Sequence, residues 1–484
     1  MIKTISKDLN KILKNSKAST ISPSIAAHYK KDESYHPAKN PDIIAFPKNS
    51  EEVSAIHKYC YENEINIIPF GQGSGFEGGV IPQNKNSNES EIERPNLCLD
   101  MMKHMNNIVN VFPSPDRYAQ VQAGVTREQL NDYIRDTGLW FPIDPGANAT
   151  LGGMSSTSAS GTNAVRYNTM KENVINMEVV LPNGEIIHTA GENRSTIKSS
   201  AGYNLTELFV GSEGTLGTIC QSTLRLHPIA DYLTAATCEF ESIDDATATA
   251  ENVLTLGIPV ARMEFLDEVA LRCVNSDLPP DQKLNLSAKT KAALFFELSS
   301  SSQNYLNEMV ENIQWLAEEN NAYNFSFSHE LEERNKLWKA RHRAYYSMIK
   351  EFQYGKNRLG YSTDVCVPIT KVGHCIKESK EIVARSKYLN KCGGIIGHVG
   401  DGNFHVFFGV DTENQEELAE LKDLADQIAY LALDNNGTMT GEHGIGLGKK
   451  HLLEKQVGSG SYQVMKLLKN SIDPKNLMNP GKIF

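Results

Sequence analysis

The chain has 484 residues, of which 40% are hydrophobic and 22% charged, so it is long enough for two or three domains with a sizeable core. Its 48 Lys and Arg against 59 Asp and Glu give a net charge of −11 without a basic block, which argues against nucleic acid as a partner. The eight cysteines are scattered without a CxxC pair, which argues against an iron–sulfur cluster or a disulfide scaffold and favours a reducing compartment.

No apolar run approaches the roughly 18–20 residues of a membrane span. The Lys-containing N-terminus lacks the apolar core of a signal peptide and is too poor in Arg for a mitochondrial presequence. We therefore expect a cytoplasmic protein without a transmembrane segment, while a peripheral contact with the inner face of the membrane stays open.

The N-terminal part has the pattern of an α/β domain. Residues 1–40 indicate a short helix and a polar loop, and 43–47 indicate a strand. A helix is expected from Ser50, with apolar residues on one face, and the next strand is expected at 66–70.

That strand runs into GQGSGFEGG at 71–79, in which Gly73, Gly75 and Gly78 match the dinucleotide pattern GxGxxG. The pattern requires a helix to begin at the third glycine, whereas Val-Ile-Pro-Gln follows here, and then a polar stretch at 84–93 that we expect to be a surface insertion. We interpret the loop as a nest of backbone N–H groups that wraps a phosphate, with a flexible turn as the alternative.

A capping box predicts the next helix. Thr126 and Gln129 have the spacing of such a box, and we expect Leu130, Tyr133 and Ile134 to face the core.

The densest small-residue segment is DPGANATLGGMSSTSASGTNAVRYNT at 144–169. With few large side chains it cannot form a core, and its Gly, Ser and Thr residues suit a chain that lies along a pyrophosphate and a ribityl group. Disorder is the competing interpretation. A third Gly-rich piece follows at 209–219.

From about residue 225 the pattern changes. Strands are expected at 233–240 and 293–299, and amphipathic helices at 243–257 and 303–320. No internal repeat is visible, and two domains that meet near 220–230 are the simplest division.

Two further motifs carry candidate metal ligands. In GHVGDGNFH, a Gly-rich turn between two expected strands allows His398 and His405 to lie on one side, although their spacing of seven on a straight strand would separate them. In GEHGIG, Glu442 and His443 are neighbours. Two histidines and a carboxylate form a common catalytic metal site, so His398, His405 and Glu442 are the expected ligands of a divalent metal, with His443 available as a base. Ordinary loop or core histidines are the alternative.

At this point the chain resembles a known family over nearly all of residues 40–484. The three Gly-rich loops in this order, GHVGDGNFH, GEHGIG and the terminal NPGKIF resemble the FAD-linked 2-hydroxyacid dehydrogenases, which have the vanillyl-alcohol-oxidase type of flavin fold. Within that family, LWKARHRAYY (337–346) and GYSTDVCVP (360–368) look most like the cytochrome-linked D-lactate dehydrogenases.

The resemblance implies an α+β fold in which a two-part FAD-binding domain is followed by an α/β substrate (cap) domain with an antiparallel sheet. The implied division is an N-terminal helix and loop at 1–40, the FAD-binding domain at 41–225, the substrate domain with the metal site at 226–450, and a C-terminal segment at 451–484 that returns to the FAD-binding domain.

The resemblance also implies that 71–79 holds the FAD pyrophosphate and that 144–161, 211–219 and Asn479 line the flavin. The implied cofactor residues are Pro69, Gly71, Gly73, Ser74, Gly75, Pro145, Gly146, Thr150, Gly152, Gly153, Ser160, Gly161, Glu213, Gly214, Gly217, Ile219 and Asn479. Some members of this fold tether FAD through a His in the first loop. No His occurs between residues 69 and 80, so we predict non-covalent FAD.

By the same matching, His398, His405 and Glu442 resemble the ligands of a divalent metal (Zn or Mn), His443 the base, and Arg341 the residue that binds the substrate carboxylate. Relatives that act on 2-hydroxydicarboxylic acids carry a Lys and an Asn where this chain has Ser362 and Phe407. Both differences favour a short monocarboxylate.

The expected function is oxidation of a short D-2-hydroxy acid, D-lactate to pyruvate, with metal-assisted deprotonation of the hydroxyl and hydride transfer to the flavin N5. Electrons would pass to an external acceptor such as cytochrome c, a quinone or an electron-transfer protein, and a homodimer is compatible with the sequence. The FAD subunit of a glycolate-oxidising complex and a D-2-hydroxydicarboxylate dehydrogenase are the alternatives within the family. A metal-dependent hydrolase and a nicotinamide-dependent dehydrogenase are the alternatives outside it.

Overall fold

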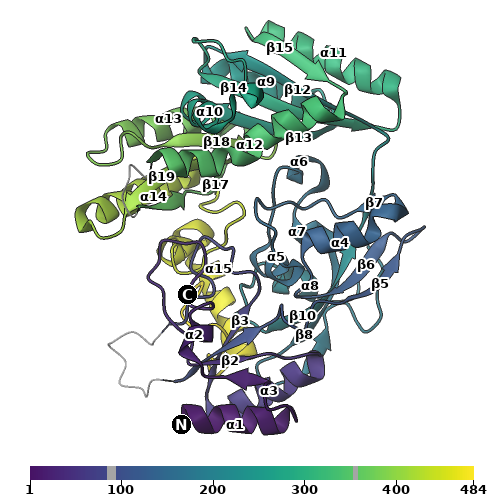
Figure 1. Cartoon of the computed structure of the whole chain (residues 1–484), viewed down its shortest axis with the longest axis vertical. Helices are drawn as coiled ribbons and strands as arrows, with labels where there is room; N and C mark the ends of the chain where they lie inside the picture. Colours follow the sequence, from purple (N-terminus) through teal and green to yellow (C-terminus); the bar gives the residue numbers. More distant parts are fainter. Residues whose placement is uncertain (84–93, 353–357) are drawn as a thin grey trace. The chain divides into compact units, whose positions relative to one another are not determined.

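A computed structural model of the chain describes residues 1–83, 94–352 and 358–484 (Figure 1). The surface insertion expected at 84–93 lies outside the described residues. The chain divides into two compact units. Unit 1 contains Met1–Ser160, Asn168–Ile229 and Glu442–Phe484, and unit 2 contains Gly161–Tyr167 and Ala230–Gly441.

The helices of unit 1 are α1 (Ile2–Ile12), α2 (Pro23–Ala26), α3 (Ser50–Asn63), α4 (Arg127–Ile134), α5 (Leu151–Thr157), α7 (Met170–Asn173), α8 (Leu205–Phe209) and α15 (Lys450–Ile472), with the 3₁₀ turn η1 (Arg135–Thr137). Its strands are β1 (Ser19–Thr20), β2 (Ile43–Ala45), β3 (Asn66–Phe70), β4 (Asn96–Asp100), β5 (Ile108–Phe112), β6 (Tyr118–Gln122), β7 (Leu139–Trp140), β8 (Val174–Val180), β9 (Ile186–His188), β10 (Thr218–Arg225) and β11 (His227–Pro228).

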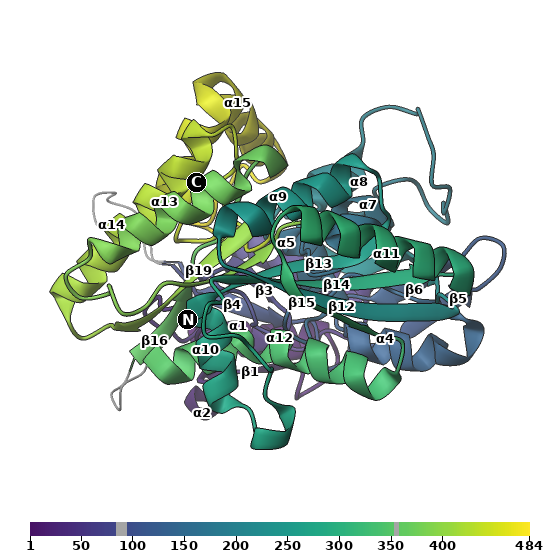
Figure 2. The same ribbon diagram turned by 90° about the horizontal axis from the view of Figure 1, so that it is seen from above.

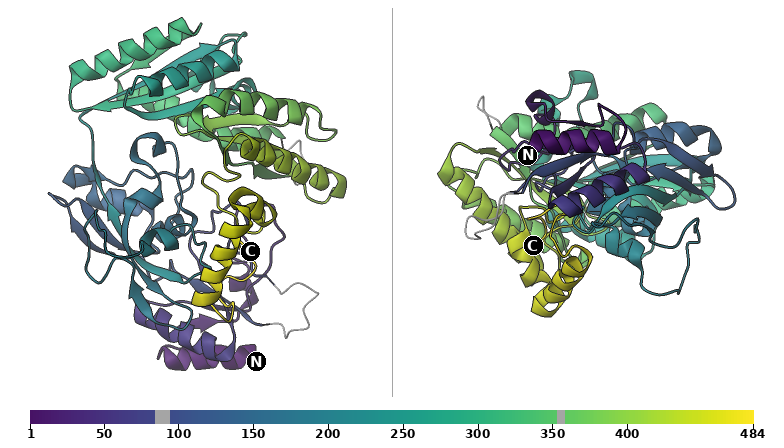
Figure 3. Two further views of the ribbon diagram at one scale, coloured as in Figure 1. Left: turned by 180° about the vertical axis from the view of Figure 1, so that it is seen from behind. Right: turned by 90° about the horizontal axis from the view of Figure 1, so that it is seen from below.

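Two sheets form the frame of unit 1. The first has the order β1-β2-β4-β3, and its strands β2, β4 and β3 are parallel. Helices α1 and α3 lie side by side at this sheet (Figure 3). The second sheet has the order β5-β6-β10-β8-β9 and is antiparallel throughout. The strand expected at 66–70 is β3, which leads directly into the first Gly-rich loop.

The capping box of α4 is confirmed, because Thr126 accepts a hydrogen bond from the backbone of Gln129 and the Gln129 side chain accepts one from Thr126. Leu130 and Ile134 are buried as expected, but Tyr133 is 66% exposed, so its expected core position was wrong. Successive helical residues are rotated by about 100°, and only the stripe through residues four apart faces the core of this two-turn helix.

The helices of unit 2 are α6 (Ala164–Tyr167), α9 (Ile243–Thr255), α10 (Glu268–Asp277), α11 (Gln303–Glu319), α12 (Leu331–Phe352), α13 (Val372–Ala384) and α14 (Gln415–Asp434), with the turns η2 (Pro280–Gln282) and η3 (Ile369–Lys371). Its strands are β12 (Tyr232–Phe240), β13 (Val260–Asp267), β14 (Ala292–Ser300), β15 (Tyr323–Ser328), β16 (Arg358–Ser362), β17 (Val365–Cys366), β18 (Gly394–His398) and β19 (Asn403–Asp411).

These strands form one antiparallel sheet in the order β15-β12-β14-β13-β18-β19-β16, to which β17 is joined through β19. Helices α9 and α11 lie on one face of the sheet, and α10 and α12 lie on the other (Figure 2). Because both faces are covered, the central strands are buried, and the sheet carries the largest hydrophobic cluster of the chain's described part. In the described residues, no helix is long and apolar enough to cross a membrane.

Candidate active site

The three Gly-rich loops meet in unit 1. A Cβ atom on Gly71 of the first loop would lie 2.3 Å from Thr150 Oγ1 of the second. A Cβ atom on Gly214 of the third loop would lie 3.3 Å from the Pro69 ring, and Gly214 has a positive φ of 71° that favours glycine. The first loop and the strand that leads into it therefore leave no room for a Cβ atom between them and the second and third loops.

Hydrogen bonds fix the third loop on the second. The backbone N–H of Gly211 donates to Ser155 O at 2.9 Å, and that of Glu213 donates to Ser156 O at 2.8 Å. Helix α5, which ends just beyond these serines, begins at its N-cap Thr150, whose hydroxyl accepts the N–H of Gly153.

Asn479 connects the C-terminal segment to the same loops. Its buried side-chain amide donates to Gly79 O at 2.9 Å and to Glu213 O at 2.8 Å, and its backbone N–H donates to Ile67 O at the start of β3. The C-terminal segment thus lies beside the first and third loops.

The remaining expected cofactor residues are not all in these loops. At the end of the third Gly-rich piece, Gly217 directly precedes β10 and Ile219 lies within that strand. Ile219 is buried and a Cβ on Gly217 would lie 2.8 Å from Val180 O, so both positions pack on the sheet. Gly161 belongs to unit 2. The residues in or beside the loops are Gly73, Ser74, Gly75, Pro145, Gly146, Gly152 and Ser160.

Loops of small residues whose backbones approach so closely are suited to a pyrophosphate and a ribityl chain, because backbone N–H groups and hydroxyls can reach the ligand without obstruction by side chains. The described part of the first loop continues to residue 83 without a helix, whereas a nicotinamide dinucleotide site requires a helix to begin at the third glycine. The loops of unit 1 therefore fit FAD.

In unit 2, the hairpin of β18 and β19 brings His398 and His405 together. The turn between them places Gly402 at a φ of 90°, where a Cβ would lie 2.0 Å from Val367 O. The two imidazole rings are 5.5 Å apart between centroids and nearly perpendicular, and a ring nitrogen of each lies within 4.8 Å of the other. The expected approach of the two histidines is present.

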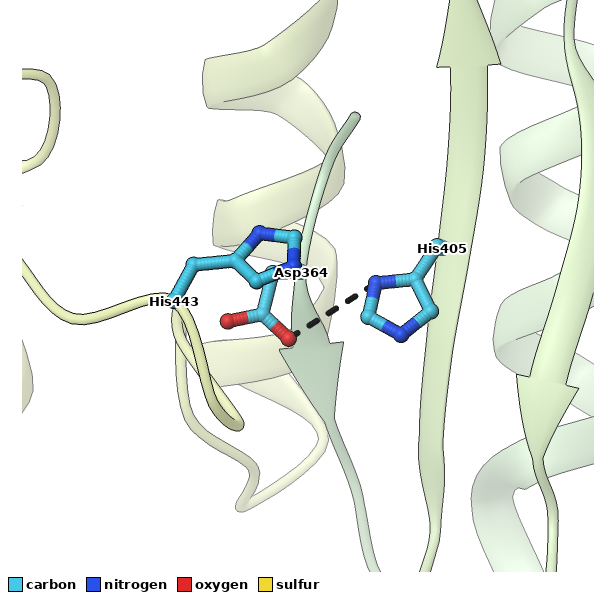
Figure 4. Close-up of side chains that lie close together, drawn as sticks. All are labelled: Asp364, His405 and His443. Carbon is cyan, nitrogen blue, oxygen red and sulfur yellow. Dashed lines mark ion pairs between the residues drawn. The ribbon is translucent and has the colours of Figure 1, made fainter. Parts of the chain in front are cut away.

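Both rings are oriented through Nδ1. His398 Nδ1 lies 2.7 Å from Glu264 Oε1, and His405 Nδ1 donates to Thr363 O at 3.0 Å. Asp364 Oδ1 is 3.8 Å from the same nitrogen of His405, a contact drawn in Figure 4. Metal-binding histidines characteristically donate one ring N–H to a carboxylate or carbonyl and offer the other nitrogen to the metal. The pair therefore fits a divalent cation held through Nε2.

Glu264 also contacts the residue expected to bind substrate. Arg341 on α12 donates to Glu264 Oε2 from Nε at 2.8 Å and from Nη2 at 2.5 Å. Burial alone would raise the pKa of Glu264, but the charge of Arg341 and the hydrogen bonds from His398 and Arg341 outweigh it and hold the pKa below its ordinary value. The convergence of two guanidinium donors on one oxygen is the contact expected of an ionised carboxylate.

Asp364 organises the other side of the hairpin. Its Oδ1 accepts from Asn403 Nδ2 at 2.9 Å, and its Oδ2 accepts from the hydroxyl of Thr440 and the N–H of Gly441, both at 2.8 Å. Sequence reasoning missed Asp364 and Glu264 as site residues. The available signal was an acid among residues with a strand pattern, at 264 within β13 and at 364 directly before β17, since a fully buried carboxylate almost always has a partner.

Glu442 and His443 follow Gly441 directly and belong to unit 1. The His443 ring packs on Phe76 of the first Gly-rich loop, with centroids 4.9 Å apart. Beyond it, the buried Glu213 carboxylate accepts the N–H groups of Ile445 at 2.7 Å and Gly446 at 2.8 Å. Burial raises the pKa of Glu213, and the two N–H donors oppose that shift. The side chain of Glu213 therefore holds the GEHGIG segment against the FAD-binding unit.

Comparison with known proteins agrees with this geometry. A family model for an FAD binding domain matches residues 41–190, and the model for the C-terminal domain of FAD linked oxidases matches residues 230–483. The fold has a TM-score of 0.79 to p-cresol methylhydroxylase, at 16% identity over 99% of this chain and 96% of that one. The fold and loops define an FAD-dependent flavoprotein, and the predicted α+β fold class is confirmed. The chain belongs to the family of FAD-linked oxidases.

Its relatives include several 2-hydroxyacid enzymes. The chain is 44% identical to a probable mitochondrial D-lactate dehydrogenase of Danio rerio, over 96% of this chain and 88% of that protein. It is 40% identical to the mitochondrial D-lactate dehydrogenase [cytochrome] 1 of Saccharomyces cerevisiae, over 93% and 73%. It is 31% identical to the glycolate oxidase subunit GlcD of Bacillus subtilis, over 92% and 89%. Two of these names state a mitochondrial location, so the cytoplasmic location of this chain stays a prediction.

Proposed function

We propose that the chain oxidises a short D-2-hydroxy acid and that this acid is D-lactate, which is converted to pyruvate. The electrons pass through non-covalently bound FAD to an external acceptor. The names of the two relatives at 44% and 40% identity support the substrate, and the second name supports a cytochrome as the acceptor. The main support from geometry is the buried pair His398 and His405, both held through Nδ1.

We further propose that His398, His405 and Glu442 hold a divalent cation, Zn or Mn. Glu442 is joined by one peptide bond to Gly441, whose N–H is held by Asp364. When bound, the cation acts as a Lewis acid that lowers the pKa of a coordinated hydroxyl, and FAD accepts the hydride equivalents from C2.

The residues of the chain then have distinct roles. Arg341 uses Nε and one hydrogen of Nη2 for Glu264, which leaves the edge formed by Nη1 and Nη2 for two parallel hydrogen bonds to the substrate carboxylate. His443 accepts the hydroxyl proton at a ring nitrogen, because an imidazole has the right intrinsic pKa near neutrality. Its packing on Phe76 restricts the orientation of the ring.

The surroundings of His405 favour a monocarboxylate. Phe407 lies on the same face of β19, with ring centroids 6.0 Å from His405, and is buried. Ser362 is its direct partner across β16 and β19. A second substrate carboxylate beside an apolar ring would lose hydration without gaining a cationic partner. A 2-hydroxydicarboxylate is therefore a weaker candidate, whereas the relation to GlcD keeps a subunit of a glycolate-oxidising complex as the second candidate.

The decisive test is the visible absorption spectrum of the purified protein under anaerobic conditions, before and after separate additions of D-lactate, L-lactate and glycolate. We expect an oxidised-flavin spectrum that D-lactate bleaches and L-lactate leaves unchanged. Bleaching by glycolate alone would favour the second candidate. Absence of flavin after reconstitution with FAD would contradict the proposed function.

A further inference from the structure

Within unit 2, one buried carboxylate contacts both a proposed metal ligand, His398, and the proposed substrate-binding residue, Arg341. Glu264 is 0% exposed and lies on β13, opposite β18. The antiparallel register pairs Phe265 with Gly397, so the next position along sets Glu264 across from His398. Its two oxygens have separate partners, with Oε1 facing His398 and Oε2 facing Arg341.

The contact with Oε1 determines the tautomer of His398. An ionised carboxylate only accepts hydrogen bonds, so the Nδ1 atom at 2.7 Å must carry the proton. In the neutral ring the lone pair is then on Nε2, which is the nitrogen that a metal would take. A glutamine at this position would accept from Arg341 with its amide oxygen and would then direct its NH₂ group at His398. Nδ1 of His398 would have to accept that hydrogen bond, which moves the proton of the neutral ring to Nε2.

The contact with Oε2 determines the plane of the Arg341 guanidinium. Two donors of that group, Nε and Nη2, converge on one oxygen, so rotation about the side chain would break both hydrogen bonds. In the part of the chain that the structure describes, the hydrogen bonds of the Arg341 side chain come from Nε and Nη2 and not from Nη1. The bonds from Nε and Nη2 to Glu264 thus fix the orientation of the edge formed by Nη1 and Nη2, which is the edge proposed to bind the substrate carboxylate.

We propose that Glu264 is a positioning residue for the reaction, which sets both the metal-binding tautomer of His398 and the carboxylate-binding edge of Arg341. The inference rests on the proposed function. Because a 2-hydroxy acid presents its carboxylate and its hydroxyl on adjacent carbons, a fixed relation between these two side chains selects for that substrate class over isolated alcohols or acids.

The test compares Glu264→Gln with the matched control Asp267→Asn in the holoprotein. Asp267 is an equally buried carboxylate on β13 that pairs with Lys380 at 2.8 Å and caps α10, and Asn retains the capping ability. Equilibrium dialysis against Zn²⁺ or Mn²⁺ measures metal affinity, and steady-state assays with an artificial acceptor separate KM from kcat.

For Glu264→Gln we expect metal affinity to fall about 10- to 100-fold, the range for loss of a partner of a metal ligand, and KM for D-lactate to rise about 10-fold or more, with flavin content unchanged. Asp267→Asn should change neither metal affinity nor KM. Equal behaviour of the two variants would overturn the role of Glu264. A wild-type protein that binds no divalent metal or does not oxidise 2-hydroxy acids would instead contradict the proposed function.

A measurement on the wild-type protein covers the case in which Glu264→Gln does not fold. The protein is labelled with ¹⁵N-histidine, kept loaded with FAD and depleted of metal. Long-range ¹H–¹⁵N correlation spectra then report the tautomer of His398, whose resonance is identified by its absence in His398→Gln. A protonated Nδ1 is expected. A protonated Nε2 with a bare Nδ1 would exclude the proposal.

Discussion

The side-chain amide of Asn479 donates a hydrogen bond to the backbone carbonyl of Glu213 at 2.8 Å, and so ties the C-terminal segment to the third Gly-rich loop. The same amide donates to Gly79 in the first loop. A single side chain therefore holds the first and third Gly-rich loops, which we expect to line the flavin.

We expect Asn479→Ala to raise the Kd for FAD about 10- to 100-fold, because two hydrogen bonds of about 0.5–1.5 kcal/mol each are lost. Titration of the apoprotein with FAD, followed by flavin fluorescence, measures the change. Asn110→Ala, which removes an exposed amide on β5, is the control and should leave the Kd unchanged. An unchanged Kd for Asn479→Ala would show that the loops hold their position without it.

His405→Ala should lose bound metal and D-lactate oxidation together, because one of the proposed ligands is removed. Metal analysis of the purified variant and the rate with an artificial acceptor are the measurements. His374→Ala, at an exposed position on α13, is the matched control. Activity that survives exhaustive chelation of the wild-type protein would rule out the metal.

His443→Ala should lower kcat by about 10²–10⁴, the usual range for loss of a general base, while FAD stays bound. The acidic limb of the pH–rate profile should disappear in the variant, since the group that must be deprotonated is absent. His451→Ala on α15 is the control. Near-normal turnover would remove His443 from this role.

Acid should destabilise unit 1 through His57. Burial lowers the pKa of His57 to about 4, and its ring is held between Leu181 O and the Thr218 hydroxyl. Between pH 6.5 and 4 the unfolded chain binds a proton that the native protein does not. The free energy of unfolding therefore falls as pH decreases through this window, by up to about 1.4 kcal/mol per pH unit for this histidine.

Urea unfolding of the wild-type protein and of His57→Gln at pH 7, 6 and 5 measures this contribution. The variant should be less stable at pH 7 and should show a shallower decline with acid. Some decline remains, because burial and two nearby arginines also lower the pKa of His227 to about 4. The exposed His28→Gln is the control. Parallel pH profiles of the wild type and His57→Gln would contradict the buried neutral state of His57.

Precipitation with acid should release all of the flavin into the supernatant. No His occurs in the first Gly-rich loop between residues 69 and 80, so that route to a covalent bond is absent from the chain. Yellow colour that stays with the denatured polypeptide would show covalent attachment at another residue.

Local patterns in the sequence predicted much of the scaffold. The capping box of Thr126 and Gln129, the strand at 66–70 before the first Gly-rich loop, and the turn between His398 and His405 all depend on neighbours along the chain. Capping, turn geometry and hydrophobic period act over a few residues, so the sequence by itself determines them. The resemblance to the flavin family rested on the same local motifs.

Tertiary structure decided which distant side chains meet. Glu264 is separated by 134 residues from His398 and by 77 from Arg341, and only the pairing of β13 with β18 and the packing of α12 bring the three together. Tyr133 shows the same limit on a smaller scale, since periodicity alone does not say how wide a stripe of a helix the core covers. Long-range strand register and burial arise from the whole fold, so no local pattern specifies them.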